Sequence, residues 1–291
     1  MGLFDRLPVS LISVDSAQVY RGLDIGAAKP DPSLLARYPH ALIDIREPEQ
    51  SYSAADFVSD AEQAMHAAAA GGRLPVLVGG TVLYFRALLY GLDSLPAANA
   101  DVRRELAERA ERLGWPALHA ELARHDPLAA QRIRPSDPQR IQRALEVLAL
   151  TGKPLSELQS QARLPRFRAL RLVLTASDRG SLHARIERRV DQMLAAGLME
   201  EVARLRQRPG LNPDQPAMRS VGYRQAWQAL EGQIDRDALR QSIIAATRQL
   251  AKRQLTALRK FPQGLWYDRA RSRTIETIFE ASRRFSETGG D

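Results

Sequence analysis

The sequence predicts an α/β fold in which a parallel sheet forms the core and an all-helical segment is inserted into it. Two observations support this prediction. Before residue 95 and after residue 165, short apolar runs alternate with helical segments, as expected for parallel strands joined by helical crossovers. Between about residues 95 and 165, the apolar residues follow helical spacing only. We therefore expect a core domain of residues 1–94 and 166–291 and an insertion domain of residues 95–165.

The first part of the core is expected to contain three strands. The apolar run 9–15 ends abruptly in the polar pair Asp15 and Ser16, which is typical of a buried parallel strand. Ser53 and Asp56 have the spacing of a capping box and predict the start of an alanine-rich helix. The expected elements are strands at 9–15, 41–45 and 74–81 and helices at 53–70 and 83–89.

The rest of the chain is expected to be mainly helical. Turn signals at Gly114 and at 152–154 separate the helices of the insertion, and the apolar run 170–175 returns the chain to the sheet. The expected helices are 100–113, 116–125, 126–133, 138–150, 179–196, 198–207, 222–231, 235–260 and a terminal one from about 273, with one further strand at 265–267.

Composition excludes several classes of protein. The chain has 291 residues, 44% of them hydrophobic, and no cysteine, which removes disulfides, thiol nucleophiles and cysteine metal sites and fits a reducing cytoplasm. The five histidines show no metal-binding spacing, so a zinc site is not expected. No apolar run is long enough for a membrane span, and the N-terminus has no secretory signal.

The positive charge is concentrated in one segment. The net charge is +8, and residues 219–260 contain nine basic residues against three acidic ones. Within this segment Arg248, Lys252, Thr256 and Arg259 fall on one side of the predicted helix and form a polar basic stripe. Such a stripe can be an ordinary wet surface, but its lack of acidic residues favours a surface that faces phosphates.

A carboxylate and a hydroxyl are expected at one rim of the sheet. Asp15 and Thr81 each follow a strand, and the carboxyl ends of parallel strands meet at the same edge. Asp15 could act as a general base, hold Mg²⁺ through water, or simply cap the next turn. Gly79 and Gly80 could let the backbone approach a ligand, or form an ordinary turn before a helix.

Two further clusters suit anion or RNA recognition, although an exposed polar surface would look the same. Gln139, Arg140 and Arg143 fall within one helical turn, and both residue types can bind base edges or phosphates. The segment 219–224 places an arginine on each side of a glycine, where either could clamp a diphosphate or an RNA phosphate.

Ten segments in consistent order resemble the tRNA dimethylallyltransferases, also called tRNA isopentenyltransferases, of bacterial type. The resemblance covers about residues 9–268. It rests on Ile12–Ser16, Tyr20, Asp24–Gly26, Ala28–Pro30, Tyr52–Phe57, Val78–Thr81, Asp137–Arg140, Arg143–Val147, Val221–Gln225 and Thr247–Gln254.

The resemblance implies a fold, a reaction and a set of site residues. The fold would be a P-loop-NTPase-like parallel sheet with an all-helical insertion. The reaction would move a dimethylallyl group from dimethylallyl diphosphate to N6 of the adenosine beside the anticodon, with Mg²⁺ assisting diphosphate departure. The partner would be the anticodon stem-loop of tRNA, bound by a cytoplasmic monomer.

By the same resemblance, Asp15 would be the general base and Thr81 would orient the adenine or the diphosphate beside it. Arg224 would bind the diphosphate. The implied tRNA contacts are Asp15, Ser16, Ala17, Gln18, Thr81, Arg103, Gln139, Arg140, Ile141, Gln142, Arg143, Arg219, Ser220, Val221, Gly222, Tyr223, Arg224, Lys252, Arg253, Gln254, Leu255, Thr256, Ala257, Leu258 and Arg259.

The sequence departs from the family in one respect. The family begins with a strand and a Gly-x-x-x-x-Gly-Lys-Ser/Thr loop that cradles the diphosphate, and no such loop occurs in these 291 residues. A shortened chain is the expectation, weakly active or inactive, poorly stable, and with the strand 9–15 partly unpaired. The alternative is a divergent member that binds diphosphate through Arg219, Arg224 and Mg²⁺.

Two other functions stay open at this point. A transferase that prenylates free adenine nucleotides would not need the helical lobe or the basic stripe, so these features argue against it. A tRNA-binding protein without catalysis is compatible with the missing loop.

Overall fold

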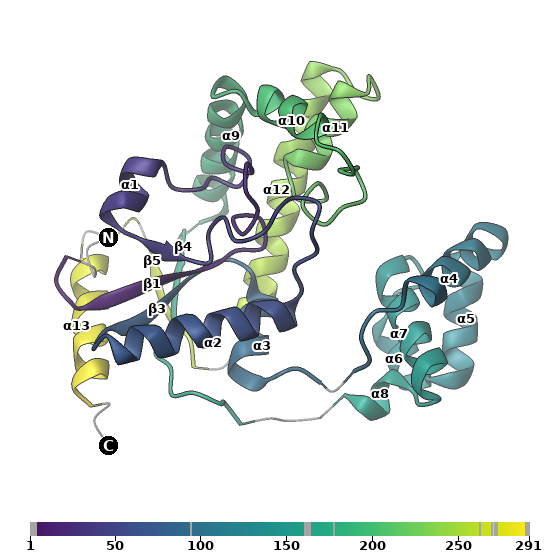
Figure 1. The fold of residues 1–291 in the computed structure, drawn as a ribbon, viewed down its shortest axis with the longest axis horizontal. Coiled ribbons are helices and arrows are strands. Elements are labelled where there is room, and N and C mark those ends of the chain that lie inside the picture. Colours follow the sequence, from purple (N-terminus) through teal and green to yellow (C-terminus); the bar gives the residue numbers. More distant parts are fainter. Residues whose placement is uncertain are drawn as a thin grey trace. The chain divides into compact units, whose positions relative to one another are not determined.

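The computed structural model describes residues 5–93, 95–159, 164–176, 178–261, 263–268, 270 and 273–288. The chain divides into two compact units. Unit 1 consists of Met1–Leu88 and Phe167–Asp291, and unit 2 of Leu89–Arg166. Both units appear in Figure 1, and each is described below by itself.

Unit 1 is an α/β unit with parallel strands. Its strands are β1 (Val9–Val14), β2 (His40–Ala41), β3 (Leu74–Gly79), β4 (Leu172–Thr175) and β5 (Leu265–Asp268). Its helices are α1 (Pro32–Arg37), α2 (Ala54–Ala70), α3 (Val82–Tyr90, which runs on into unit 2), α9 (Arg179–Ala195), α10 (Leu198–Arg206), α11 (Tyr223–Leu230), α12 (Arg236–Arg259) and α13 (Thr274–Glu287).

The strands form two parallel sheets, one ordered β2-β1-β3 and one made of β4 and β5. β1 is the middle strand of the first sheet, with Leu11 beside His40 and all six of its residues in register with β3. β1 is thus paired along its whole length with β3, and with β2 only at Leu11 and Ile12. The edge strands are β2 and β3, and Val78 on β3 is 50% exposed.

The second strand is shorter than predicted, because the chain turns after Ala41. Leu42 and Asp44 have φ angles of 65° and 56°, which no strand residue adopts. Asp44 is held there by the ammonium group of Lys29 at 2.6 Å. The other predicted strands and helices are present with bounds shifted by two residues or fewer, and α1 and the short α8 described below were not predicted.

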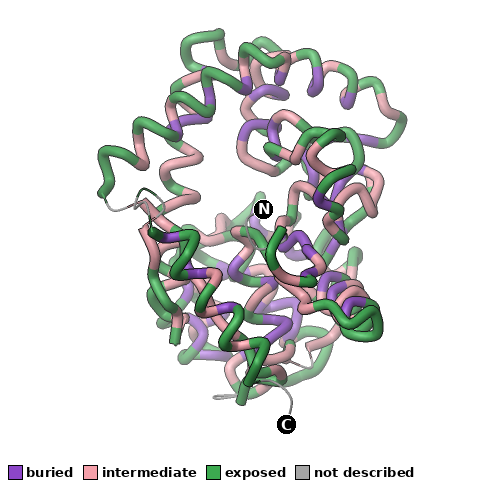
Figure 2. The backbone as a smooth tube through the Cα atoms, turned by 90° about the vertical axis from the view of Figure 1, so that its left-hand side faces the viewer, coloured by how far each residue is buried: buried purple, intermediate pink, exposed green. Residues whose placement is uncertain are grey.

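The core of unit 1 lies between the three-stranded sheet and the helices around it. α2 packs on β1 and β3, while α9, α10, α11 and α12 pack against one another (Figure 1). Ser53 and Asp56 form the predicted capping box at the start of α2. Figure 2 shows buried and exposed residues alternating along the helices, as expected for amphipathic elements. No described helix is both long and apolar enough to cross a membrane.

Unit 2 is entirely helical in the part that the structure describes. Its helices are α4 (Ala100–Leu113), α5 (Trp115–His125), α6 (Pro127–Arg132), α7 (Pro138–Thr151) and α8 (Leu155–Leu158). They enclose their own apolar core, in which Leu118, Leu122 and Ile141 are fully buried. Unit 2 therefore has a hydrophobic core separate from that of unit 1.

Candidate active site

The turns after β1 and β3 are joined through one hydroxyl group. The Thr81 Oγ1 atom accepts a hydrogen bond from the backbone N–H of Ser16 at 3.1 Å and lies 3.4 Å from the Ser16 hydroxyl. The backbone N–H of Thr81 donates to the carbonyl oxygen of Val14 at 3.2 Å. The carboxylate of Asp15 and the hydroxyl of Thr81 are thus brought to one rim of the sheet, as the sequence predicted.

Glycine allows this close approach. A Cβ atom at Gly79 would lie 2.1 Å from the carbonyl oxygen of Val14, so only glycine fits there. A Cβ atom at Gly80 would lie 2.5 Å from the side-chain amide nitrogen of Gln254, which donates to the Gly80 carbonyl at 2.9 Å. The turn is therefore held against β1 on one side and against α12 on the other.

The two oxygens of the Asp15 carboxylate have different surroundings. Oδ1 accepts the backbone N–H groups of Ala17 at 2.8 Å and Gln18 at 3.3 Å. Asp15 therefore caps the next turn, which is one of the three roles that the sequence allowed. Oδ2 accepts no hydrogen bond from any described residue. One oxygen therefore fixes the carboxylate, and the other is available to a proton donor on a substrate.

Gln18 stabilises a loop, although it was predicted as a tRNA contact. Its amide nitrogen donates to the carbonyl oxygens of Ala27 and Ala28 at 3.3 Å, and its amide oxygen accepts the Ser13 hydroxyl at 3.0 Å. These bonds join the end of β1 to the segment 24–28.

Sequence reasoning missed Arg189, which lies within electrostatic reach of Asp15. Burial among protein atoms lowers the pKa of the Arg189 guanidinium, and the charge of Asp15 acts in the opposite direction. The residue remains charged at neutral pH and keeps contact with solvent, and it makes no ion pair with a described residue. In the sequence it looks like any exposed arginine of an amphipathic helix, because only the fold brings α9 toward Asp15.

The segment 24–27 is held by a buried carboxylate from α10. Glu201 accepts the backbone N–H groups of Asp24, Ile25 and Gly26 at 3.2, 2.8 and 3.3 Å. It also accepts the hydroxyl of Tyr223 at 2.6 Å. Neither the segment nor Glu201 was assigned a role from the sequence, since the two are about 175 residues apart.

Tyr223, one of the predicted tRNA contacts, has a structural role inside unit 1. Its side chain is fully buried, and its hydroxyl both donates to Glu201 and accepts the backbone N–H of Ala27 at 3.2 Å. Burial raises the pKa of this hydroxyl, so it stays protonated and remains a donor. Its neighbours Arg219 and Arg224 are exposed and form no ion pair with a described acidic residue.

One residue of the basic stripe on α12 is already paired with an acidic side chain. Arg248 forms an ion pair with Glu187 of α9, so its charge is neutralised by a residue outside the stripe. Lys252, Arg253 and Arg259 are exposed, whereas Leu255, Ala257 and Leu258 are half-buried. Lys252 and Arg259 line a cavity of about 600 Å³ together with Arg179 and Trp266.

The predicted contacts in unit 2 lie around α7. Arg103 and Arg143 both bind the carboxylate of Glu146, and Arg140 forms an ion pair with Asp137, the N-cap of the helix. Gln139 is exposed, and the Gln142 amide donates to the Arg103 carbonyl at 3.1 Å. The side chain of Ile141, another of the predicted contacts, is fully buried in the core of unit 2.

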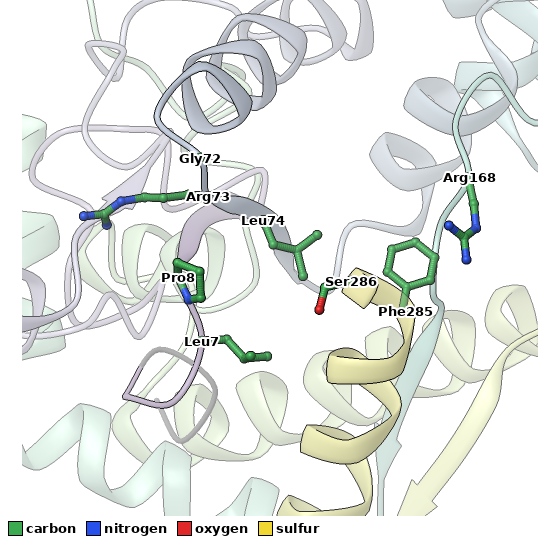
Figure 3. Close-up of a pocket in the computed structure, with 8 residues that line it drawn as sticks. All are labelled: Leu7, Pro8, Gly72, Arg73, Leu74, Arg168, Phe285 and Ser286. Carbon is green, nitrogen blue, oxygen red and sulfur yellow. The ribbon is translucent and has the colours of Figure 1, made fainter. Parts of the chain in front are cut away.

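A second cavity, of about 440 Å³, lies at the opposite end of the sheet (Figure 3). Leu7 and Pro8 precede β1, and Leu74 is the first residue of β3. Two arginines line this cavity, Arg73 and Arg168. The guanidinium of Arg168 lies on the ring of Phe285 and donates to the carbonyl of Thr288. Ligands of parallel sheets bind at the carboxyl ends of the strands, so this cavity is not the candidate site.

Comparison with known proteins identifies the relatives of the chain. A family model described as IPP transferase matches residues 18–261. A tRNA dimethylallyltransferase of Thiobacillus denitrificans is 56% identical over 269 residues, which are 92% of this chain and 86% of that protein. One of Bordetella petrii is 52% identical over 288 residues, covering 96% of this chain and 92% of that protein.

Solved structures agree with these relatives. The full-length tRNA isopentenylpyrophosphate transferase of Bacillus halodurans superposes with a TM-score of 0.71 at 35% identity, covering 98% of this chain and 90% of that one. A eukaryotic dimethylallyltransferase acting on tRNA superposes with a TM-score of 0.78 at 22% identity, over 98% of this chain and 75% of that one, which bears on the fold alone. The predicted fold class is confirmed.

Proposed function

This chain belongs to the IPP transferase family, and from that membership we infer that it transfers a dimethylallyl group from dimethylallyl diphosphate to tRNA. The acceptor we propose is N6 of the adenosine beside the anticodon. One observation supports this assignment. The Asp15 carboxylate, which has one oxygen free of hydrogen bonds from described residues, and the Thr81 hydroxyl lie at the same rim of the sheet, where Thr81 accepts the backbone N–H of Ser16.

The proposed chemistry is a direct displacement. The N6 nitrogen forms a bond to C1 of the dimethylallyl group while the bond from C1 to the diphosphate oxygen breaks. The proton lost by the amine passes to Oδ2 of Asp15, and diphosphate leaves with the electron pair. Thr81 is positioned to hydrogen-bond the adenine or the diphosphate. Because diphosphate is a good leaving group, catalysis consists mainly of positioning and charge stabilisation.

Positive charge for the diphosphate comes from arginines and, in this proposal, from Mg²⁺. Arg189 interacts electrostatically with Asp15 and has no described ion-pair partner, and Arg224 is exposed at the start of α11. No three described His, Cys, Asp or Glu side chains cluster as a metal site. In this proposal the ion is held mainly by the substrate phosphates. Mg²⁺ would supply charge neutralisation on the leaving diphosphate.

The proposed tRNA surface of unit 1 consists of exposed basic residues that remain unpaired within the described chain: Arg219, Arg224, Lys252, Arg253 and Arg259. Unit 2 contributes Arg103, Gln139, Arg140 and Arg143 to binding of the anticodon stem-loop. Reaction at N6 requires the adenine to leave its stack, and the binding of phosphates can compensate for that cost.

The decisive experiment compares Asp15→Asn with Asp214→Asn, an exposed carboxylate whose replacement changes the charge equally. Transfer of labelled dimethylallyl groups to an anticodon stem-loop is measured in single turnovers, and RNA binding by fluorescence anisotropy. We expect Asp15→Asn to slow transfer about 100- to 10,000-fold with little change in Kd, and Asp214→Asn to alter neither.

Other outcomes point to the alternative functions. Weaker binding with an unchanged rate at saturating RNA would make Asp15 an RNA contact and not the base. Transfer to free AMP in preference to RNA would indicate an adenylate isopentenyltransferase. RNA binding by the unsubstituted chain with no transfer to any acceptor would indicate a tRNA-binding protein without catalysis.

A further inference from the structure

Unit 2 contains one carboxylate that is completely buried and surrounded by donors. Glu146 of α7 has no exposed side-chain surface. Its Oε1 atom accepts the Arg103 Nε at 2.9 Å and the backbone N–H of Asn99 at 2.8 Å. Its Oε2 atom accepts the Arg103 Nη2 at 3.1 Å and the Arg143 Nη1 at 2.7 Å.

The Glu146 carboxylate is bound by two guanidinium groups, which is one more than a structural ion pair needs. Burial alone would raise the pKa of Glu146, but the two guanidinium groups and the Asn99 N–H outweigh it and lower that pKa. The carboxylate is therefore ionised, and one negative charge faces two positive ones. The group retains a net charge of +1, although a single arginine would have been enough to neutralise the buried carboxylate.

Both arginines remain open to solvent on their other side. The side chain of Arg103 is 43% exposed and that of Arg143 is 29% exposed, while Glu146 between them is inaccessible. Arg103 binds Glu146 with Nε and Nη2, so its Nη1 group is not used there. Arg143 is fixed further by a bond from Nη2 to the Pro96 carbonyl at 2.7 Å.

A guanidinium held in this way differs from an ordinary surface arginine. Ordinary arginines lose rotamer freedom when they bind a phosphate or a base edge, and that loss reduces affinity. Here Glu146 fixes the plane of Arg103 before any ligand arrives, and the Gln142 amide holds the Arg103 carbonyl. A fixed plane favours ligands of matching geometry over other polyanions.

We propose that Glu146 is a positioning residue that presents Arg103 and Arg143 in a fixed orientation to the RNA and so provides selectivity for the tRNA anticodon stem-loop. This proposal rests on the proposed function, since it concerns how the same substrate is recognised. Glu146 itself touches no RNA in this arrangement, because it is covered by the two arginines.

The test uses Glu146→Gln in the full chain, with Glu108→Gln as the matched control. Glu108 lies on α4 in the same unit, is exposed, and has no described partner, so both variants add the same net charge. Binding is measured by anisotropy for a cognate anticodon stem-loop and for an unrelated hairpin of the same length and charge.

We expect Glu146→Gln to weaken cognate binding about tenfold while binding of the unrelated hairpin is unchanged or slightly stronger. Glu108→Gln should change both RNAs alike, because it alters only the charge. A merely structural role for Glu146 would weaken both RNAs together, and that outcome, or an unchanged selectivity, would overturn the proposal.

A double-mutant cycle with Arg103→Lys shows whether Glu146 acts through the arginine. The lysine keeps the charge but loses the planar fork. We expect Arg103→Lys alone to weaken cognate binding about tenfold. Adding Glu146→Gln to the Arg103→Lys variant should weaken it by less than a further factor of about two. Independent, multiplicative losses would show that Glu146 does not act through Arg103.

Thermal melting of each variant accompanies the binding measurements. If Glu146→Gln does not fold, the binding measurements on Arg103→Lys test the proposal by themselves. Weaker binding of the cognate RNA alone supports the proposal, and equally weaker binding of both RNAs overturns it. If the unsubstituted chain does not prefer the cognate stem-loop, the proposed function fails first. A preference that survives in both variants refutes only the role of Glu146.

Discussion

The hydroxyl of Thr81 accepts a hydrogen bond from the backbone N–H of Ser16, a residue 65 positions earlier in the chain. This bond links the turn after β3 to the turn after β1, next to the residue proposed as the base. Thr81 therefore has a structural role that can be separated from any contact with substrate.

Replacing Thr81 by valine should reveal that structural role, because the two side chains have nearly the same shape. Without the hydroxyl, the Ser16 N–H loses its acceptor, and we expect the free energy of unfolding to fall by about 1 kcal/mol. Urea denaturation measures the loss. Thr81→Ser keeps the oxygen and should stay near the unsubstituted chain, and equal effects of both substitutions would contradict this explanation.

A methyl group at position 26 should disturb the segment held by Glu201. The Cβ atom of Gly26→Ala would lie 2.4 Å from the ring of Tyr223, which is fully buried and cannot move away. We expect a destabilisation of about 1–3 kcal/mol in urea denaturation. Gly71→Ala is the matched control, because its Cβ would meet its neighbours at an ordinary 3.5 Å. Equal stability of the two variants would refute the predicted clash.

The stability of unit 2 should fall in acid because of Asp126. Burial acts to raise the pKa of this carboxyl, but hydrogen bonds from Ser156 and the Ala129 N–H outweigh it, so the pKa is lowered on folding. The stabilisation is complete above the unfolded pKa of about 4 and is lost as the pH falls through the folded value. Thermal melting between pH 7 and pH 3 follows this loss.

Asp126→Asn should remove that part of the acid sensitivity. We expect it to be less stable than the unsubstituted chain at pH 7 and nearly equal to it at the lowest pH. Glu111→Gln, an exposed change in the same unit, should keep the original pH dependence. A gap between Asp126→Asn and the unsubstituted chain that stays constant with pH would argue against this role of Asp126.

Lys252 and Arg248 should contribute unequally to RNA binding, although both belong to the stripe on α12. Lys252→Gln should reduce the slope of log Kd against log salt by about one, because one phosphate contact is lost. Arg248→Gln should change the slope much less, since Glu187 already neutralises that arginine. Glu187→Gln should strengthen binding, and equal slopes for the two basic substitutions would refute this distinction.

Most of the fold could be predicted from local patterns in the sequence. The capping box of Ser53 and Asp56 and the apolar runs of β1 and β3 are short-range signals, and the structure follows them closely. The second strand is the exception, because its end depends on the contact between Lys29 and Asp44, which lies in the loops and has no periodic signature.

The candidate site could be predicted only in part, because its partners are distant in the sequence. The pairing of Asp15 with Thr81 followed from the topology of parallel strands. The tie of Arg248 to Glu187 could not be predicted, since the acid stands on another helix. Burial of Tyr223 and the approach of Arg189 to Asp15 also depend on how α9 and α11 pack.

The bond from the Gln254 amide to the Gly80 carbonyl fixes where α12 sits along its own axis. A 24-residue helix is a rigid rod of about 36 Å, so every side chain on it stands at a set distance from the turn that carries Thr81. The helix therefore sets the distance between its basic side chains and that turn. In the proposed complex, an RNA backbone bound by Lys252 and Arg253 would lie at a fixed distance from the point where a base would react, without any recognition of its sequence.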